Sequence, residues 1–467
     1  MNIAKSLILP IILASAAPLN ALADNDPAVT GKIAISDDEA YPARPEVPVL
    51  EYAGKSIYIP NDLRSMDLND PESKWSYKRM ACTENIVLFW AKEFGDNLAK
   101  APDLDGHNMK VDLPNLLAKL EKFYNYFYND LKWTKPGTKA DRYRMMVMLD
   151  YSLEGTAYGG DYDGQIGALW IAPNRVQDEP LNCIAHELGH SFQLQISCDG
   201  EGDAWGGSGF FEMASQWMLW QVNPDWQTDE NYHLQAYRDL THKAFLHIDN
   251  IYHSPYILEI WGEKHGPGFI AELFRQGKVG EDPVMTYKRI TGIDQKQFND
   301  EMMEAQCRFI NWDIDRVRDH ARPYANIWHT PLEKSGNRWR PAKDRCPENY
   351  GFNAIALEVP KPGADVTVDF RGEAGAKGYN TVNKKSAGWR YAIVAVDTDG
   401  KSHYSPVMAS SKGKLRYSTP ADKELSHLWL VVMGAPTEHW RNIDGEENPG
   451  DAQWPYSFAL KGTSVKQ

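Results

Sequence analysis

Long apolar runs in the first half of the chain predict a sheet flanked by helices. Residues 143–150 and 166–172 are short, nearly continuous apolar runs bounded by turn residues, so we expect two buried strands side by side. Residues 113–133 have apolar positions at helical spacing, and residues 85–94 also show a helical pattern. The segment 158–164, between the two strands, is rich in Gly and Asp, which predicts a turn, with a calcium site as the alternative.

The middle of the chain is predicted to be mostly helical. Residues 210–221 are apolar on most faces and contain neither Gly nor Pro, which predicts a buried helix after a glycine-rich loop at 199–209. Helical patterns at 267–276 and 297–318 are typical of the whole segment 229–322. We expect this segment to form a helical half-domain that closes a cleft from the side opposite the sheet.

Beyond about residue 345 the apolar runs become shorter and are separated by turns. The pattern predicts an all-β sandwich over 345–467, with strands at 354–360, 365–370, 390–396 and 428–433. Trp389, Trp440 and Trp454 lie in this part and raise the possibility of glycan binding, although most Trp residues of a sandwich belong to its core.

The N-terminus has the pattern of a secretory signal peptide over residues 1–23. A short, positively charged start is followed by the apolar stretch 6–17 and by an Ala-x-Ala cleavage site before Asp24. We therefore expect export to the periplasm or the extracellular space. Residues 24–74, rich in Pro, Asp and Ala, are predicted to be a linker or a loosely packed lead-in.

The clearest candidate chemistry is the pair His186 and His190 with Glu187 between them. Residues four apart on a helix lie on one face, so both imidazoles can bind the same metal ion. Glu187 projects beside them, where it can act as general base on a water molecule. A helix N-cap is expected at Asn182. This HExxH pattern predicts a zinc site.

Glu212 is the predicted third ligand. It is the single charged residue of the apolar helix 210–221, and a carboxylate is costly to bury unless a cation meets it. Three protein ligands leave one position open, which is typical of a catalytic rather than a structural zinc site. Ser215 and Gln216 follow on the same helical face and could hold Glu212 or an outer ligand nitrogen by hydrogen bonds.

Two simpler interpretations of these residues remain open. HExxH also occurs in ordinary amphipathic helices whose histidines are merely packed or exposed. A metal could also serve folding alone, or the site could be degenerate and only bind. Retention of Glu187 favours hydrolysis over a structural site, because a structural site has no need for a general base.

The motif residues resemble known zinc peptidases. HExxH followed some twenty residues later by a glutamate is similar to the gluzincin metallopeptidases, and Ala185–Gln193 resembles the HExGHxxQ form of the enhancin and mucinase-like members. Together with the run Phe211–Trp217, the chain resembles an uncharacterised family of secreted bacterial zincin-like proteins from about residue 75 to the C-terminus, including Gly388–Tyr391 and Leu428–Pro436. The thermolysin branch differs, because it has Asn-Glu where this chain has Phe-Glu.

The resemblance implies an α+β zincin-like (gluzincin) catalytic domain over 75–340, followed by the all-β C-terminal sandwich. Gluzincin-like enzymes commonly take a donor for the reaction's oxyanion from a later helix or loop, and the segment 246–256 concentrates His and Tyr. Tyr252 and His253 are the candidates there. A core or groove role is the alternative for both.

Composition narrows the choice of partners. With a formal net charge of -14, the chain is a poor match for nucleic acid or an anionic membrane surface. No run of eighteen apolar residues follows the N-terminus, so no membrane span is expected. The five cysteines are too few for a disulfide framework, and their number is odd. Cys183 and Cys198 could form a bridge that braces the HExxH helix; a thiolate ligand from Cys183 is the weaker alternative.

Together these features predict a secreted zinc metallopeptidase that hydrolyses peptide bonds of extracellular protein or glycoprotein. Glu187 would be its general base, and Zn²⁺ its cofactor. The alternative from another class is a zincin-like protein that binds glycans or cell-surface polymers, through the sandwich, without turnover. Zinc-dependent hydrolysis of a non-peptide ester or amide is a third possibility.

Overall fold

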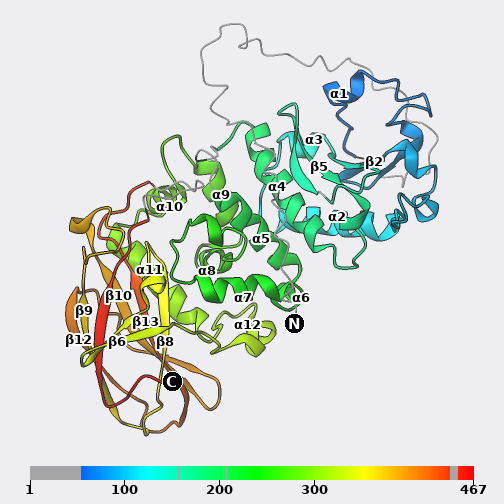
Figure 1. The fold of residues 1–467 in the computed structure, drawn as a ribbon. Helices are drawn as coiled ribbons and strands as arrows, with labels where there is room; N and C mark the ends of the chain where they lie inside the picture. Colours follow the sequence, from blue (N-terminus) through cyan, green and yellow to red (C-terminus); the bar gives the residue numbers. More distant parts are fainter. Residues whose placement is uncertain (1–53, 156, 203–204, 206–208, 442–450, 467) are drawn as a thin grey trace.

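A computed structural model describes residues 54–155, 157–202, 205, 209–441 and 451–466. The predicted signal peptide and the first thirty residues of the lead-in lie outside the described residues. In Figure 1 a sheet with its helices lies at one end of the molecule, a helical segment lies in the middle, and a second β-rich part lies at the other end.

The N-terminal sheet has five strands in the order β1-β2-β3-β5-β4. The central strands β2, β3 and β5 are parallel, whereas β1 and β4 run antiparallel at the two edges. The predicted strands at 143–150 and 166–172 are confirmed as the neighbours β3 and β5. The strand bounds are β1 Met80–Cys82, β2 Ile86–Trp90, β3 Met145–Leu149, β4 Tyr158–Tyr162 and β5 Ile166–Ile171.

The predicted helix at 85–94 is wrong, because Ile86–Trp90 forms strand β2. Every residue of β2 is buried, since the strand pairs on both sides and is covered on both faces. A parallel strand of this kind has a continuous apolar run and lacks the alternation that marks a half-exposed strand. The short run therefore could not be distinguished from a buried helix by its periodicity.

The segment 158–164 is an edge strand followed by a turn, where the sequence suggested only a turn. Asp161 Oδ1 accepts from the backbone N–H of Gly164, and Asp163 Oδ2 accepts from Tyr58 Oη and the backbone N–H of Asn61. Within the described ranges, this segment contributes to no group of residues that could hold a metal ion. The calcium alternative therefore has no support here.

Part of the expected lead-in belongs to the core of the molecule. Ile57, Tyr58 and Leu63 are buried, and Ser56 forms a parallel bridge with Tyr143 at the start of the β3 segment. The interpretation of residues 24–74 as loosely packed is therefore wrong for this portion. The short helix α1 Asn61–Arg64 lies within it.

Two long helices pack against the sheet. The predicted helix at 113–133 is α2 Leu113–Asn129, whose N-cap Asp112 accepts from Asn115 N–H. The HExxH helix is α4 Asn182–Cys198, and its Ser191 hydroxyl donates to the carbonyl of Ala168 at 2.6 Å. Gln195 Oε1 accepts from Gly167 N–H at 2.7 Å, so α4 is attached directly to β5.

The start of α4 differs from the prediction. Asn182 is the first helical residue rather than the cap, and the preceding Leu181 has left-handed backbone with φ 55° and gives no side-chain cap. The Asn182 carboxamide oxygen instead accepts from Asn223 Nδ2 at 2.9 Å, at the end of α5. Tertiary packing therefore uses the side chain that the local pattern assigned to capping.

The suggested disulfide between Cys183 and Cys198 is also wrong. None of the five cysteines, all of which lie within the described residues, forms a disulfide, and these two lie at opposite ends of α4. At a helical rise of about 1.5 Å per residue their Cα atoms are roughly 22 Å apart, far beyond the reach of a disulfide.

The helical middle begins with the predicted buried helix, now α5 Phe210–Val222. The predicted helix at 297–318 ends early, since α11 stops at Phe309 and the chain turns through Trp312, which has φ 49°. The other helices are α3 Lys139–Arg142, α6 Trp226–Asp229, α7 Asn231–Leu240, α8 Tyr256–His265, α9 Phe269–Gln276, α10 Pro283–Thr291, α11 Gln295–Phe309 and α12 Arg318–Ala321.

The C-terminal part contains two sheets, with strand orders β11-β10-β13-β8 and β12-β9-β14-β7-β6. They share one core, in which the rings of Phe370 and Tyr391 stack at 4.1 Å. The four predicted strands are confirmed as β8, β9, β10 and β13. The bounds are β6 Leu332–Ser335, β7 Arg338–Pro341, β8 Phe352–Leu357, β9 Asp365–Gly372, β10 Trp389–Asp397, β11 Ser402–Tyr404, β12 Lys412–Ser418, β13 Leu425–Gly434 and β14 Tyr456–Lys461.

The four-stranded sheet is buried on its second face as well. Val394 and Val431 belong to the core of the helical part, and Arg390 pairs with Asp300 of α11 at 2.7 Å. This explains why all nine residues of β10 are buried. None of the described helices is both long and apolar enough to cross a membrane.

Candidate metal centre

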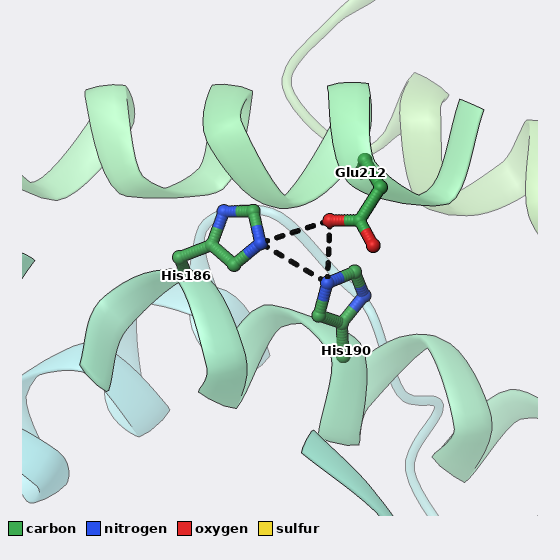
Figure 2. Close-up of side chains that lie close together, drawn as sticks. All are labelled: His186, His190 and Glu212. Carbon is green, nitrogen blue, oxygen red and sulfur yellow. Dashed lines mark hydrogen bonds and ion pairs between the residues drawn. The ribbon is translucent and has the colours of Figure 1, made fainter. Parts of the chain in front are cut away.

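Three predicted ligand residues converge between two packed helices. His186 and His190 project from α4, and Glu212 projects from the first turn of α5 toward them (Figure 2). Glu212 Oε2 lies 3.1 Å from Nε2 of each histidine, and the two Nε2 atoms are themselves 3.1 Å apart. Three donor atoms thus form a nearly equilateral triangle.

The two helices approach closely because Gly189 faces α5. A Cβ at this position would lie 2.8 Å from Ser215 Oγ, so a larger residue would push the helices apart. The side chains of His186 and His190 are 10% and 14% exposed, and that of Glu212 is 26% exposed. The triangle is therefore largely shielded from water, and Glu212 is its most exposed member.

Two glutamines set the orientation of the histidine rings. His186 Nδ1 lies 2.9 Å from Gln216 Oε1, and His190 Nδ1 lies 2.9 Å from Gln193 Oε1. Gln216 Nε2 donates to the Tyr252 carbonyl, and Gln193 Nε2 donates to the Phe211 carbonyl, so both amide oxygens must face the histidines. Each Nδ1 then carries the proton, which leaves a lone pair on each Nε2.

The triangle fits a zinc ion. Zinc bound tetrahedrally at about 2.0–2.1 Å from nitrogen and oxygen ligands holds those ligands roughly 3.3 Å apart, close to the spacing seen here. The donor set of two imidazoles and one carboxylate is also one that zinc prefers. His186, His190 and Glu212 could therefore hold a metal ion.

Protons can bind to the same nitrogen and oxygen atoms as a metal ion. Burial lowers the pKa of His190, but the charge of Glu212 and its hydrogen bond outweigh this and raise that pKa to about 9. Burial raises the pKa of Glu212, but the histidines outweigh it and hold that pKa well below its usual range. The electrostatics of the site thus favour a positive charge at the centre of the triangle.

The predicted general base Glu187 is held by the edge strand of the sheet. Its Oε2 accepts from the backbone N–H of Gly159 in β4 at 2.9 Å. A Cβ on Gly159 would lie 1.9 Å from the Glu187 carbonyl, so only glycine allows β4 this close to α4. The sequence treated this glycine as part of a turn.

The structure separates the two oxyanion candidates. The ring of Tyr252 lies 6.3 Å from that of His186, and its pKa is raised by burial, then by the charge of Glu212 and a hydrogen bond to it. His253 instead places Nδ1 2.7 Å from Nδ1 of His233. Tyr252 therefore lies beside the triangle, whereas the side chain of His253 contacts His233.

Ser215 and Gln216 have different surroundings. Gln216 Oε1 lies 2.9 Å from Nδ1, the outer nitrogen of His186, as the sequence suggested. Ser215 Oγ accepts from Gln193 Nε2 at 3.1 Å, so it supports His190 through that amide. Gln193 lies three residues after His190 on the same helical face, so helical spacing could have identified its role. His233 lies on another helix and had no such signal.

A second group of potential ligands, His247, Glu348 and Asp451, lies elsewhere in the described chain. A cation is already present there, because Lys243 Nζ lies 3.7 Å from Glu348 Oε1 and 3.4 Å from His247 Nε2. In contrast to the first group, this one is a mixed ion-pair cluster.

The tryptophans suggested for glycan binding are mostly internal. Trp389 and Trp454 are 2% and 1% exposed, and Trp440 packs against Trp454 with ring centroids 6.4 Å apart. Trp389 and Trp454 therefore present no ring to a sugar. Cys183 lies outside the triangle, and burial raises the pKa of its thiol to about 12, so it stays protonated.

Solved structures share only distant similarity with the chain. The M60 catalytic domain with the CBM51-1 and CBM51-2 domains of Clostridium perfringens ZmpB is 11% identical, with a TM-score of 0.29 over 84% of this chain and 60% of that one. A mutant of a family 29 carbohydrate-binding module is 11% identical, with a TM-score of 0.18 over 30% of this chain and 77% of the module.

A mutant of Xylanase10C from Cellvibrio japonicus in complex with xylopentaose is 10% identical, with a TM-score of 0.17 over 30% of this chain and 25% of the xylanase. Similarities at this level do not establish a common fold or function. No curated protein matches the chain. The sequence itself matches a family model described as a family of unknown function over residues 50–467, and the chain therefore belongs to DUF6055.

Proposed function

We propose that this protein is an exported zinc-dependent metallopeptidase of gluzincin type that cleaves protein or glycoprotein outside the cytoplasm. The ligand set is His186, His190 and Glu212, and Glu187 is the general base. Peptide bonds in protein or glycoprotein are the proposed substrate because the Ala185–Gln193 motif resembles that of mucinase-like peptidases. Export follows from the signal-peptide pattern of residues 1–23.

The observation that carries this proposal is the triangle of 3.1 Å distances together with its two glutamine partners. In their neutral forms both histidines direct a lone pair toward the carboxylate oxygen, an arrangement that a cation stabilises. The retained Glu187 favours a catalytic over a structural role for the ion.

The roles of the surrounding residues follow from their positions. Zinc, when bound, would supply a Lewis acid that polarises a carbonyl and lowers the pKa of water toward about 7. Glu187, oriented by the Gly159 amide, would take a proton from that water and deliver it to the leaving amine. Tyr252, whose raised pKa keeps it protonated, would donate to the oxyanion that develops on the substrate carbonyl.

A combined metal and cleavage assay tests the proposal. The purified protein should contain about one zinc per chain and should cleave casein or mucin; a chelator should abolish cleavage and added zinc should restore it. The Glu187→Gln variant, purified identically, controls for contaminating proteases. Glycan binding that survives chelation without any cleavage would refute the proposal and favour the binding protein instead.

If the protein cleaves neither casein nor mucin, one further assay is needed. Zinc-dependent cleavage of small ester or amide substrates, without cleavage of protein, would retain the metal site and the base but overturn the peptidase assignment. Absence of zinc from protein supplied with the metal would overturn the hydrolase assignment as a whole.

A further inference from the structure

A chain of hydrogen bonds extends from the ligand His186 through three further side chains. His186 Nδ1 meets Gln216 Oε1 at 2.9 Å, and Gln216 Nε2 lies 3.0 Å from His233 Nε2. His233 Nδ1 in turn lies 2.7 Å from Nδ1 of His253. The members come from α4, α5, α7 and the segment before α8, so the chain connects four separate parts of the helical region.

The direction of every bond in this chain is determined by one carbonyl group. The Tyr252 carbonyl can only accept, and it lies 3.0 Å from one terminal atom of the Gln216 side chain, which must therefore be the nitrogen. The second amide hydrogen then points at His233 Nε2, which must accept it. His233 keeps its proton on Nδ1 and donates it to His253.

The surroundings of His233 favour this neutral form. The residue is 8% exposed, and burial, then the proximity of His253 and His186, lowers its pKa to about 3. The nearest carboxylate oxygen is Glu230 Oε2, 3.6 Å from His233 Nε2, which is too long for a hydrogen bond. That oxygen accepts from Trp226 Nε1 at 2.8 Å instead, so Gln216 is the partner of His233 Nε2.

We propose that His233 is a positioning residue that acts on the candidate metal centre through Gln216. By accepting one amide hydrogen, His233 holds the amide oxygen against His186 and thereby directs His186 Nε2 toward the other two ligands. The other hydrogen of this amide binds the Tyr252 carbonyl, so the orientation of the Gln216 amide also keeps the Tyr252 ring beside Glu212. This inference rests on the proposed metal site.

The expected consequence of losing His233 is specific. One hydrogen of a buried amide would have no acceptor, and Gln216, which is 3% exposed, has little access to water as a substitute. The amide would then rotate away from His186 and from the Tyr252 carbonyl. Metal affinity and the position of Tyr252 should therefore change together.

The test measures zinc affinity by competition with a chromophoric chelator, and cobalt, in place of zinc, reports the geometry of the site through its visible spectrum. His233→Phe keeps the ring and removes the acceptor, whereas His233→Gln places an amide oxygen near the former Nε2. His242→Phe is the matched control, because His242 is also a buried histidine, 5% exposed, and lies outside the chain of hydrogen bonds.

The expected result is a zinc dissociation constant about tenfold higher in His233→Phe, with an altered cobalt spectrum, and a value within about threefold of the parent in His233→Gln. His242→Phe should leave both unchanged. Gln216→Met should weaken zinc binding as well, and adding His233→Phe to it should cause little further loss, since both changes act through one amide.

Several results would overturn the inference. They are unchanged zinc affinity in a folded His233→Phe variant, additive losses in the double variant, or an equal loss in His242→Phe. The zinc affinity and the cobalt spectrum can be measured without hydrolysis. If the protein binds zinc but cleaves no peptide, the comparison of the His233 and His242 variants therefore still tests this inference. Parent protein that binds no zinc would overturn both proposals together.

Discussion

The backbone amide of Gly159 donates to the side chain of Glu187 at 2.9 Å, across 28 positions of the sequence. This bond connects the edge strand β4 with the helix that carries the candidate metal ligands. Because a Cβ on Gly159 would overlap the Glu187 carbonyl, the strand and the helix meet backbone to backbone. The orientation of the proposed general base therefore depends on a glycine in the sheet.

Replacing Glu187 by Gln should abolish turnover and leave the metal bound. The Gln carbonyl oxygen can still accept from Gly159, so the local structure should persist, but the amide cannot take a proton. A loss of about 10²–10⁴-fold in kcat is expected, with unchanged zinc content by elemental analysis. Retained turnover would remove Glu187 from the role of base.

Replacing Gly159 by Ala should destabilise the protein and reduce its activity. The new Cβ would lie 1.9 Å from the Glu187 carbonyl and 2.7 Å from His190 Cβ, so β4 must move away from α4. Overpacking of this kind costs about 1–3 kcal/mol in the free energy of unfolding, which urea denaturation can measure.

The control for this change is Gly262→Ala in α8. Its new Cβ would have one neighbour within 4 Å, Trp217 Cζ2 at 3.5 Å, so it should be tolerated and could stabilise the helix by up to about 1 kcal/mol. Equal stability and activity of the two Gly→Ala variants would show that β4 does not require glycine.

Zinc should stabilise the folded protein through the first group of ligands. Metal that binds only the native state raises the free energy of unfolding by about 4 kcal/mol at a thousandfold excess over the dissociation constant. His190→Ala and Glu212→Ala should lose this gain in thermal denaturation. His247→Ala, from the second group, should keep it; loss of the gain in that variant alone would move the site to His247, Glu348 and Asp451.

Acidification should destabilise the protein through His242. Burial, and then Arg345 and Lys243, lowers the pKa of His242 to about 4, whereas an unfolded histidine titrates near 6.5. Between pH 6.5 and 4 the unfolded chain therefore binds a proton at His242 that the native state does not bind. The contribution of His242 to the free energy of unfolding is fully present above pH 6.5, and up to about 3 kcal/mol is lost as the pH drops toward 4.

The His242→Phe variant isolates this contribution. It should lose less stability than the parent protein between pH 7 and pH 4.5 in urea denaturation, because other histidines such as His233 contribute equally to both proteins. Parallel pH profiles would show that His242 is not a source of the acid sensitivity.

All five cysteines should be titratable as thiols after unfolding without a reductant. In the native protein they should react slowly, since burial raises the pKa of Cys183 and Cys307 to about 12 and the thiolate is the reactive form. A count below five in the denatured protein would indicate a disulfide and contradict the absence of disulfides among the described cysteines.

Local spacing was sufficient to identify much of the candidate site. His186 and His190 must share a helical face once residues 182–198 are a helix, and a single carboxylate in an apolar helix needs a cationic partner, which indicated Glu212. The strands β3 and β5 and the helix α5 were also predictable, because each is a long or strongly apolar segment with recognisable boundaries.

Other features could not be predicted, since they depend on contacts between distant segments. Strand β2 was mistaken for a helix because a strand buried on both faces has no alternation. Tyr252 and His253 are adjacent in sequence, yet their side chains have different neighbours: Tyr252 lies beside His186 and Glu212, whereas His253 contacts His233.

The sequence by itself therefore determined which residues could hold a metal ion and which one is the candidate base, because those choices depend on residue type and on periodicity within one or two helices. The tertiary structure alone decided which distant segments meet around those residues. The bond between Gly159 and Glu187 and the extension from Gln216 to His233 arise from segments that come together only when the sheet and the helices pack, whereas Gln193 lies on the same helix as His190. The direction of each hydrogen bond depends on which donor or acceptor the packing brings opposite.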